Sequence, residues 1–111
     1  MSFNYPEAIA SLNAEQRLHF YELFAHNLTI AIRSIWSDGE VSDADKVERI
    51  RLVNEILHRV TSKVYVLRLN LHGWTEDDTW KMIEEYVAEN KDIEAEVNAA
   101  IKFSYGSVGN S

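Results

Sequence analysis

The stretch "IRLVNEILHRVTSKVYVLRLNL", residues 50–71, decides the fold of this chain of 111 residues. Its apolar residues recur at alternating spacings of three and four, which places them on one side of an α-helix. This seam consists of Ile50, Val53, Leu57, Val60, Val64, Leu67 and Leu71. Heptads without interruption predict a long helix, beginning at Ser42 and running to about Leu71, that packs along a neighbouring helix.

Further apolar residues of the same helix lie off the seam: Leu52, Ile56, Val66 and Leu69. The helix therefore carries more apolar surface than one neighbouring helix covers. We expect these four residues to form an interface, either with a second copy of the chain or with a partner protein.

The end of this segment also fits a different secondary structure. In "VYVLRLNLHG", residues 64–73, leucine alternates with polar residues from position 67 to 72, as in a half-buried strand. A lone strand has no partner within the chain, because no second segment shows a convincing strand pattern. A helix is therefore favoured over residues 64–71, with a strand pairing across a dimer as the alternative.

Two other segments show helical periodicity. A helix is expected over residues 13–37, where Asn13 and Gln16 have the spacing of a capping box. Its apolar face comprises Phe20, Leu23, Phe24, Leu28, Ala31 and Ile35. A third helix should begin at Thr75, after a helix stop at His72-Gly73. The pattern is interrupted around residues 90–92 and then continues from Ile93 to Ile101, either as a fourth, shorter helix or as a bent extension of the third.

These elements predict one all-α domain over residues 1–111. Its architecture should be an antiparallel bundle of three long helices, with short helices at the N- and C-terminal ends. Tyr5-Pro6 resembles a helix start, since Pro is tolerated at the first helical position. The last segment, "SYGSVGNS", is expected to form a disordered tail over about 104–111.

The composition excludes several function classes. The chain has no Cys, which rules out disulfides, thiolate metal sites and cysteine nucleophiles. No apolar run approaches the length that spans a bilayer, and no signal peptide is evident, so we expect a soluble, cytoplasmic protein. The net charge is −7, which disfavours nucleic acid and acidic membranes as partners. Residues 76–96 carry nine acidic residues, either as a solvated helix face or as a docking surface for a basic partner.

The acidic stretch "WSDGEVSDADK", residues 36–46, was tested as a calcium loop. With Gly39 at position 6 of an EF-hand, Asp38, Ser42 and Asp45 fall at ligand positions 5, 9 and 12. Position 3 is then Trp36, which cannot bind calcium, and position 1 is Ser34. A regular EF-hand is therefore excluded.

The same stretch resembles the acidic corner of the TerB-like helical domains of tellurite resistance. This resemblance covers about ten residues, and it implies a divalent metal ion held by Asp38, Glu40, Asp43 and Asp45. The simpler interpretation is a corner between two helices. Gly39 would end the first helix, Ser42 would cap the second, and Asp43 and Asp45 would complement its dipole.

Two further constellations could carry chemistry. His19, Glu22 and His26 share one face of the first long helix at spacings that allow a metal site, although pairing between Glu and His at the edge of the core is the simpler explanation. Arg51 and His58 have the spacing used by nucleolytic HEPN domains, which are also small helical bundles. A Leu follows Arg51 where those nucleases usually have a polar residue.

The sequence favours a small acidic, non-enzymatic helical protein that acts as an interaction or regulatory module. Self-association through the helix over 42–71 is the first hypothesis. The alternatives are a metal-binding TerB-like domain and a HEPN-like ribonuclease. No cofactor is expected other than the divalent metal ion of the first alternative.

Overall fold

The computed structural model describes residues 5–69 and 76–109, and the part of the chain so described is entirely helical apart from its turns. The prediction of an all-α fold is confirmed. The elements in chain order are α1 (Tyr5–Ala10), α2 (Ala14–Ser37), α3 (Asp43–Arg68), α4 (Glu76–Glu89), the 3-10 turn η1 (Lys91–Ile93) and α5 (Glu94–Gly109).

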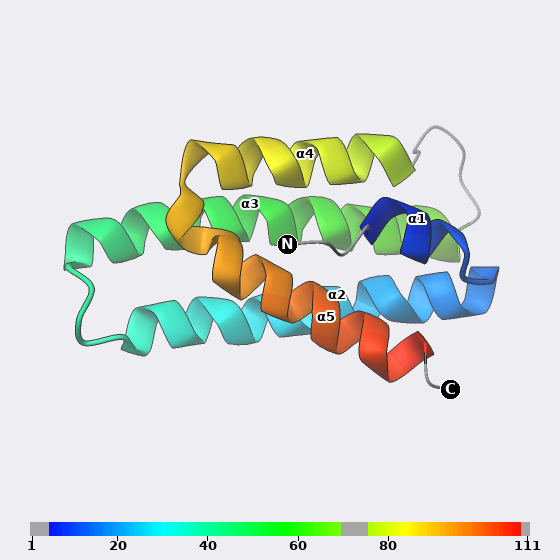
Figure 1. Cartoon of the computed structure of the whole chain (residues 1–111), viewed down its shortest axis with the longest axis horizontal. Helices are drawn as coiled ribbons and strands as arrows, with labels where there is room; N and C mark the ends of the chain where they lie inside the picture. Colours follow the sequence, from blue (N-terminus) through cyan, green and yellow to red (C-terminus); the bar gives the residue numbers. More distant parts are fainter. Residues whose placement is uncertain (1–4, 70–75, 110–111) are drawn as a thin grey trace.

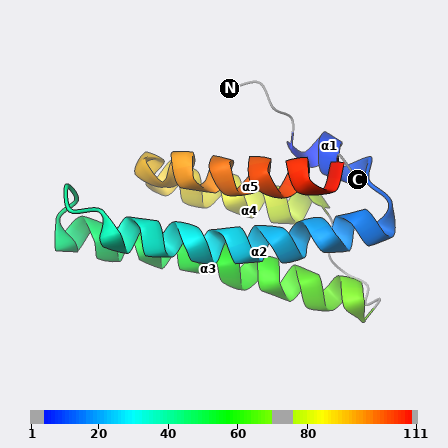
Figure 2. The same ribbon diagram turned by 90° about the horizontal axis from the view of Figure 1, so that it is seen from below.

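The helices form two layers. The antiparallel hairpin of α2 and α3 makes one layer, while α4 and α5 lie together on one of its faces (Figures 1 and 2). None of the helices formed by residues 5–69 and 76–109 lies on the opposite face of the hairpin (Figure 2). The predicted set of three long helices is met only in part, because α2 and α3 have 24 and 26 residues whereas α4 and α5 have 14 and 16.

Side-chain caps fix the starts of both long helices. The N–H of Gln16 donates to Asn13 Oδ1 at 2.8 Å, and the N–H of Asn13 donates to Gln16 Oε1 at 3.1 Å. The capping box predicted for α2 is therefore present. At α3, the N–H of Asp45 donates to Ser42 Oγ at 3.3 Å, so Ser42 is the N-cap as predicted.

The corner between α2 and α3 is set by Asp38 more than by Gly39. Asp38 leaves the helix with an extended backbone (ψ 107°), and its Oδ1 accepts the N–H of Glu40 at 2.9 Å. Gly39 lies in the turn, as expected, but its φ is outside the left-handed region, and a Cβ there would meet no atom within 4 Å. The turn therefore does not depend on the conformational freedom of glycine.

Helix α3 ends three residues earlier than predicted. It continues through Arg68, and the N–H of Leu69 still donates to Tyr65 O at 3.0 Å. The strand alternative is therefore wrong for residues 64–68. Leu71, the predicted stop at 72–73 and the predicted start at Thr75 lie outside the described residues.

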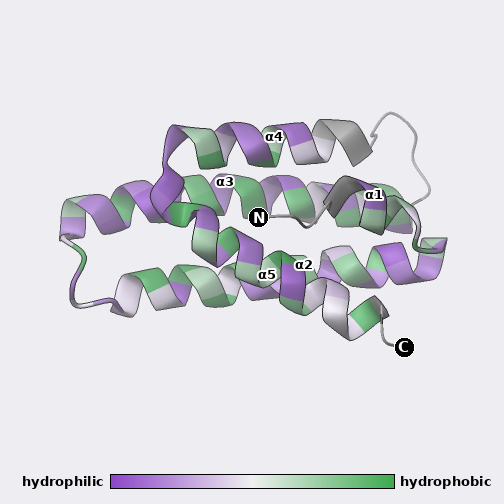
Figure 3. Cartoon of the chain, viewed as in Figure 1, coloured by the Kyte–Doolittle hydropathy of each residue, from purple (hydrophilic) through white to green (hydrophobic). Residues whose placement is uncertain are grey.

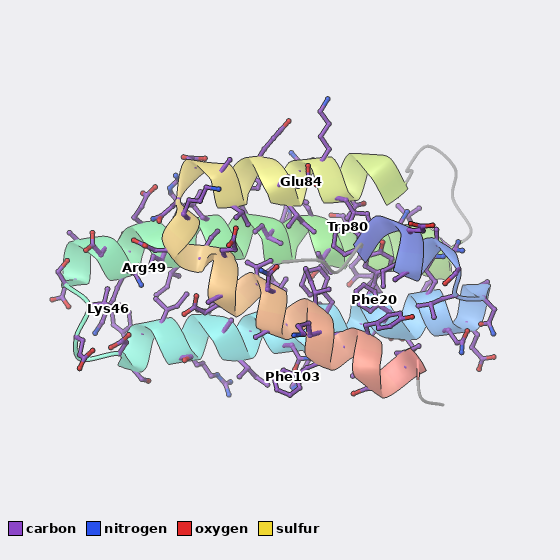
Figure 4. The ribbon with its side chains drawn as sticks, in the orientation of Figure 1. Phe20, Lys46, Arg49, Trp80, Glu84 and Phe103 are labelled. Atoms are coloured by element: carbon purple, nitrogen blue, oxygen red, sulfur yellow. The ribbon has the colours of Figure 1, made fainter. Side chains whose placement is uncertain are left out.

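The core between the two layers is built around aromatic side chains. The Trp80 ring of α4 stacks on Phe24 of α2, with centroids 6.3 Å apart, and lies at the same distance from Phe20 (Figure 4). Phe20 also meets Tyr21 edge to face at 5.1 Å. These contacts attach α4 to the hairpin, because offset and edge-to-face arrangements are the favoured geometries of aromatic pairs.

Helix α3 is buried on two sides, and this corrects the predicted interface. Leu52 and Ile56 are completely buried within the same core as the seam residues. Helix α2 packs along α3, and α4 with η1 packs on α3 as well. The prediction that Leu52 and Ile56 face a partner is therefore wrong, because the second layer of the same chain covers them. Figure 3 shows that hydrophobic residues recur along the whole length of both α2 and α3.

The predicted disordered tail is also wrong for residues 104–109, which are the last turns of α5. Ser104 and Val108 are buried, and Asn27 Nδ2 donates to Ser104 Oγ at 3.0 Å. Gly and Ser have low helix propensity, but burial against α2 outweighs it. Residues 110–111 lie outside the described part.

Replacing Ile56 by Ala should lower the free energy of unfolding by about 2–5 kcal/mol, because it opens a cavity in the core. The matched variant is Leu69→Ala, which truncates a side chain that is 64% exposed and should change stability by less than about 0.5 kcal/mol. Urea denaturation measures both. If Ile56→Ala and Leu69→Ala lowered the free energy of unfolding equally, Ile56 would not be a core residue and its predicted interface role would stand.

Gly39→Ala should leave the fold intact and raise the free energy of unfolding by about 0.4–1 kcal/mol, because it restricts the unfolded chain without straining the turn. Thermal or urea unfolding measures the change. A loss of stability would show that the corner needs a glycine after all.

Candidate functional site

The four carboxylates proposed as metal ligands lie exposed around the α2–α3 corner. Asp38 is occupied by its turn to the N–H of Glu40, and Asp43 and Asp45 stand in the first turn of α3. Among the described residues no three His, Asp or Glu side chains come close enough together to hold a metal ion. The structure therefore supports the helix-corner interpretation of this stretch.

The residues of the second proposed metal set are likewise not gathered. His19 and His26 are exposed on α2, and Glu22 between them forms an ion pair with Arg68 of α3. This pair joins the two long helices near the start of α2 and the end of α3. Glu22 thus has a structural partner in place of a metal.

Arg51, the first residue of the nuclease-like pair, is held by two carboxylates. Its Nη2 lies 3.0 Å from Glu48 Oε1 and 2.9 Å from Glu89 Oε1 of α4. The hydrogen bonds that Arg51 donates to both carboxylates raise the pKa of Arg51 further above its usual range, and the one donated to Glu48 lowers the pKa of Glu48. The guanidinium therefore ties α3 to the end of α4, while His58 is exposed about two turns further along the same side of α3.

The uncovered face of the hairpin contains a groove between α2 and α3, which we call the outer groove. Its largest hollow, about 700 Å³, lies next to the corner. The hollow is lined by Ile32, Arg33, Trp36, Ser37, Val47, Ile50, Arg51 and Asn54. Trp36 and Val47 are 62% and 61% exposed, which is unusual for side chains of this size and apolarity.

The outer groove continues along α3 as two smaller hollows. A hollow of about 470 Å³ shares Asn54 with the first and includes His58 and Thr61. A third, of about 270 Å³, shares Thr61 and reaches Tyr65 and the Arg68–Glu22 pair. The lining of the groove is thus mostly apolar at the corner and more polar around His58. At the far end it is mixed, because Ala25, Val64 and Tyr65 lie beside the Arg68–Glu22 pair.

Two of the predicted interface residues keep some exposure. Val66 is half-buried, and Leu69 is exposed one turn beyond Tyr65 on the same side of α3. Two more exposed apolar residues, Ile30 and Phe103, lie outside the three hollows, and Phe103 points away from the bundle in Figure 4.

Trp36 and Val47 were missed as binding residues by the sequence analysis. Trp36 was considered only as an obstacle to calcium, and Val47 lies off the heptad seam. The sequence does contain a hint of this site. Trp36 precedes the corner and Val47 follows it, and neither belongs to the core-facing side of its helix. That signal becomes specific only when the two helices are placed side by side.

Comparison with known proteins identifies no relative. No protein-family model, curated protein or solved structure matches the chain. None of the helices formed by the described residues combines the length and the hydropathy that a membrane crossing needs.

The Glu48–Arg51 pair predicts a dependence of stability on pH. Because Arg51 lowers the folded-state pKa of Glu48 below 4.5, the pair stabilises the fold above that pH and ceases to do so as the pH falls through the lowered pKa. The melting temperature of Glu48→Gln should lie below that of the wild type at about pH 7, and the difference should be smaller at about pH 3. A difference that is the same at both values would contradict this role.

Proposed function

We propose that the protein is a non-enzymatic interaction module that binds a partner protein in the outer groove between α2 and α3. The observation that carries this proposal is the pair of exposed apolar side chains, Trp36 and Val47, on either side of the largest hollow. Burying one such side chain contributes about 1.5–3 kcal/mol. Aromatic anchors next to an apolar pocket are the residues that dominate protein interfaces.

The groove has the dimensions of a helix-binding site. From Val47 to Thr61 it follows α3 for about 20 Å at 1.5 Å per residue, which is close to four turns of a partner helix. A partner helix would insert its apolar residues at spacings of three, four and seven between the two walls. Ile32 and Ile50, which are half-buried at the floor, supply the apolar surface beneath Trp36.

Self-association through α3 is a special case of this proposal, with a second copy as the partner. Two of the four residues that the sequence predicted for such an interface, Leu52 and Ile56, are in the core and cannot contribute to it. The exposed apolar residues that α3 retains are Val47, Tyr65 and Leu69. The first two line the outer groove, so the same surface would serve either partner.

The test is site-specific photo-crosslinking in the cells that produce the protein. A photoreactive amino acid at Val47 should give one discrete adduct, because this position lies in the groove. The matched control places the same amino acid at Lys81, an exposed position of α4 in the other layer, where the adduct should be missing.

Mass spectrometry of the adduct identifies the partner or a second copy of the chain. Trp36→Ala should reduce the yield of the Val47 adduct without lowering the melting temperature, since Trp36 is largely exposed. The same adducts at Val47 and Lys81, or none at either, would refute the proposal.

A further inference from the structure

The carboxylates of the α2–α3 corner are clustered, whereas some acidic residues of α3, α4 and η1 are paired with arginines of α3. Glu48 and Glu89 pair with Arg51, and Asp92 pairs with Arg49 at 3.4 Å. At the corner, Asp38, Glu40, Asp43 and Asp45 are exposed and form no ion pair with any residue in the described ranges. Their charge is therefore not neutralised by a neighbouring cation.

These carboxylates stand at the apolar end of the outer groove. Trp36, Ser37 and Val47 immediately flank the corner in the chain, and all three line the largest hollow. Figure 2 shows the corner extending past the end of the α4–α5 layer, where a partner can approach it. The groove thus joins an apolar hollow to the four corner carboxylates, which we call the acidic rim.

The positive charges near the hollow do not cancel this rim. Lys46 lies over the ring of Trp36, with Nζ 5.9 Å from its centroid, so it covers the aromatic wall. Arg51 is held by two carboxylates, and Arg33 lies about one turn of α2 before Ser37. The dipoles of α2 and α3 oppose each other at the corner, since one helix ends there and the other begins.

We infer that the partner in the outer groove is a basic amphipathic helix. This inference rests on the proposed function and specifies the chemistry of the partner. The apolar face of the helix enters the hollow between Trp36 and Val47, and its Lys or Arg residues lie against the corner carboxylates. Opposite potentials across the rim favour encounter and fix the orientation of the helix in the groove.

A second copy of the chain suits this surface less well. Each copy carries a net charge of −7, so two copies repel each other at low ionic strength. A basic helix is attracted under the same conditions. The acidic rim therefore discriminates between the two occupants that the apolar hollow alone would accept.

The test uses three synthetic helical peptides of about 18 residues with one identical apolar face. Their remaining positions carry Lys, Glu or Gln, and binding to the intact protein is followed by fluorescence anisotropy in about 50 mM salt. The Lys peptide should bind most tightly. Trp36→Ala should weaken its binding strongly, because the anchor of the hollow is lost.

Two charge-matched variants locate the attraction. The corner variant Glu40→Gln, Asp43→Asn, Asp45→Asn should weaken binding of the Lys peptide by about tenfold. The control variant Glu84→Gln, Glu85→Gln, Glu94→Gln removes the same charge from α4 and α5, where Glu84 lies far from Lys46 in Figure 4. It should change binding by less than about twofold.

The outcomes separate this inference from the proposed function. Equal binding of all three peptides, still lost in Trp36→Ala, would overturn the basic partner and leave the groove as the binding site. An equal effect of the two charge variants would overturn the role of the corner. A dimer in sedimentation that Trp36→Ala dissociates would identify a second copy as the occupant. No binding of any peptide to the wild type would refute both proposals.

Discussion

The structure depends on the need to cover two apolar sides of α3. Helix α2 packs along one side of α3. A second side of α3, which carries Leu52 and Ile56, must also be shielded from water. The chain meets this requirement internally, by folding α4 and η1 back onto α3. The stack of Trp80 on Phe24 then attaches the second layer to α2, so that one core joins both layers.

Covering α3 from within the chain leaves one face of the hairpin free of the helices that the structure describes. On that face the groove between α2 and α3 stays open, and its corner end exposes Trp36 and Val47. These residues contribute little to the core, and burying them on a partner would be favourable. The corner carboxylates, which serve the turn and the start of α3, also give this end of the groove its negative charge.

The arginines show how charged side chains hold the layers together. Arg51 connects α3 with Glu89 of α4, Arg49 connects α3 with Asp92 of η1, and Arg68 connects α3 with Glu22 of α2. All three arginines belong to α3, while the carboxylates come from its neighbours. Two acidic residues of the segment over 76–96, Glu89 and Asp92, are therefore used within the chain, whereas the corner carboxylates form no ion pair with any described residue.

Local signals in the sequence determined the helices and their starts. Periodicity predicted α2 and α3, and the capping residues Asn13 and Ser42 were found from their own spacing, because a cap involves only residues three apart. The prediction of a disordered tail was wrong because it rested on the low helix propensity of "SYGSVGNS". The helix there is stabilised by burying Ser104 and Val108 in the core, which local propensity does not reveal.

Only the tertiary structure decided which apolar residues are core and which are surface. The sequence placed Leu52 and Ile56 on a second face of one helix, but a periodicity does not say whether that face meets the same chain or another. Trp36 and Val47 became a site only when α2 and α3 lay side by side, since each contributes a different wall. A sequence determines the face of each helix, whereas long-range packing determines what covers it.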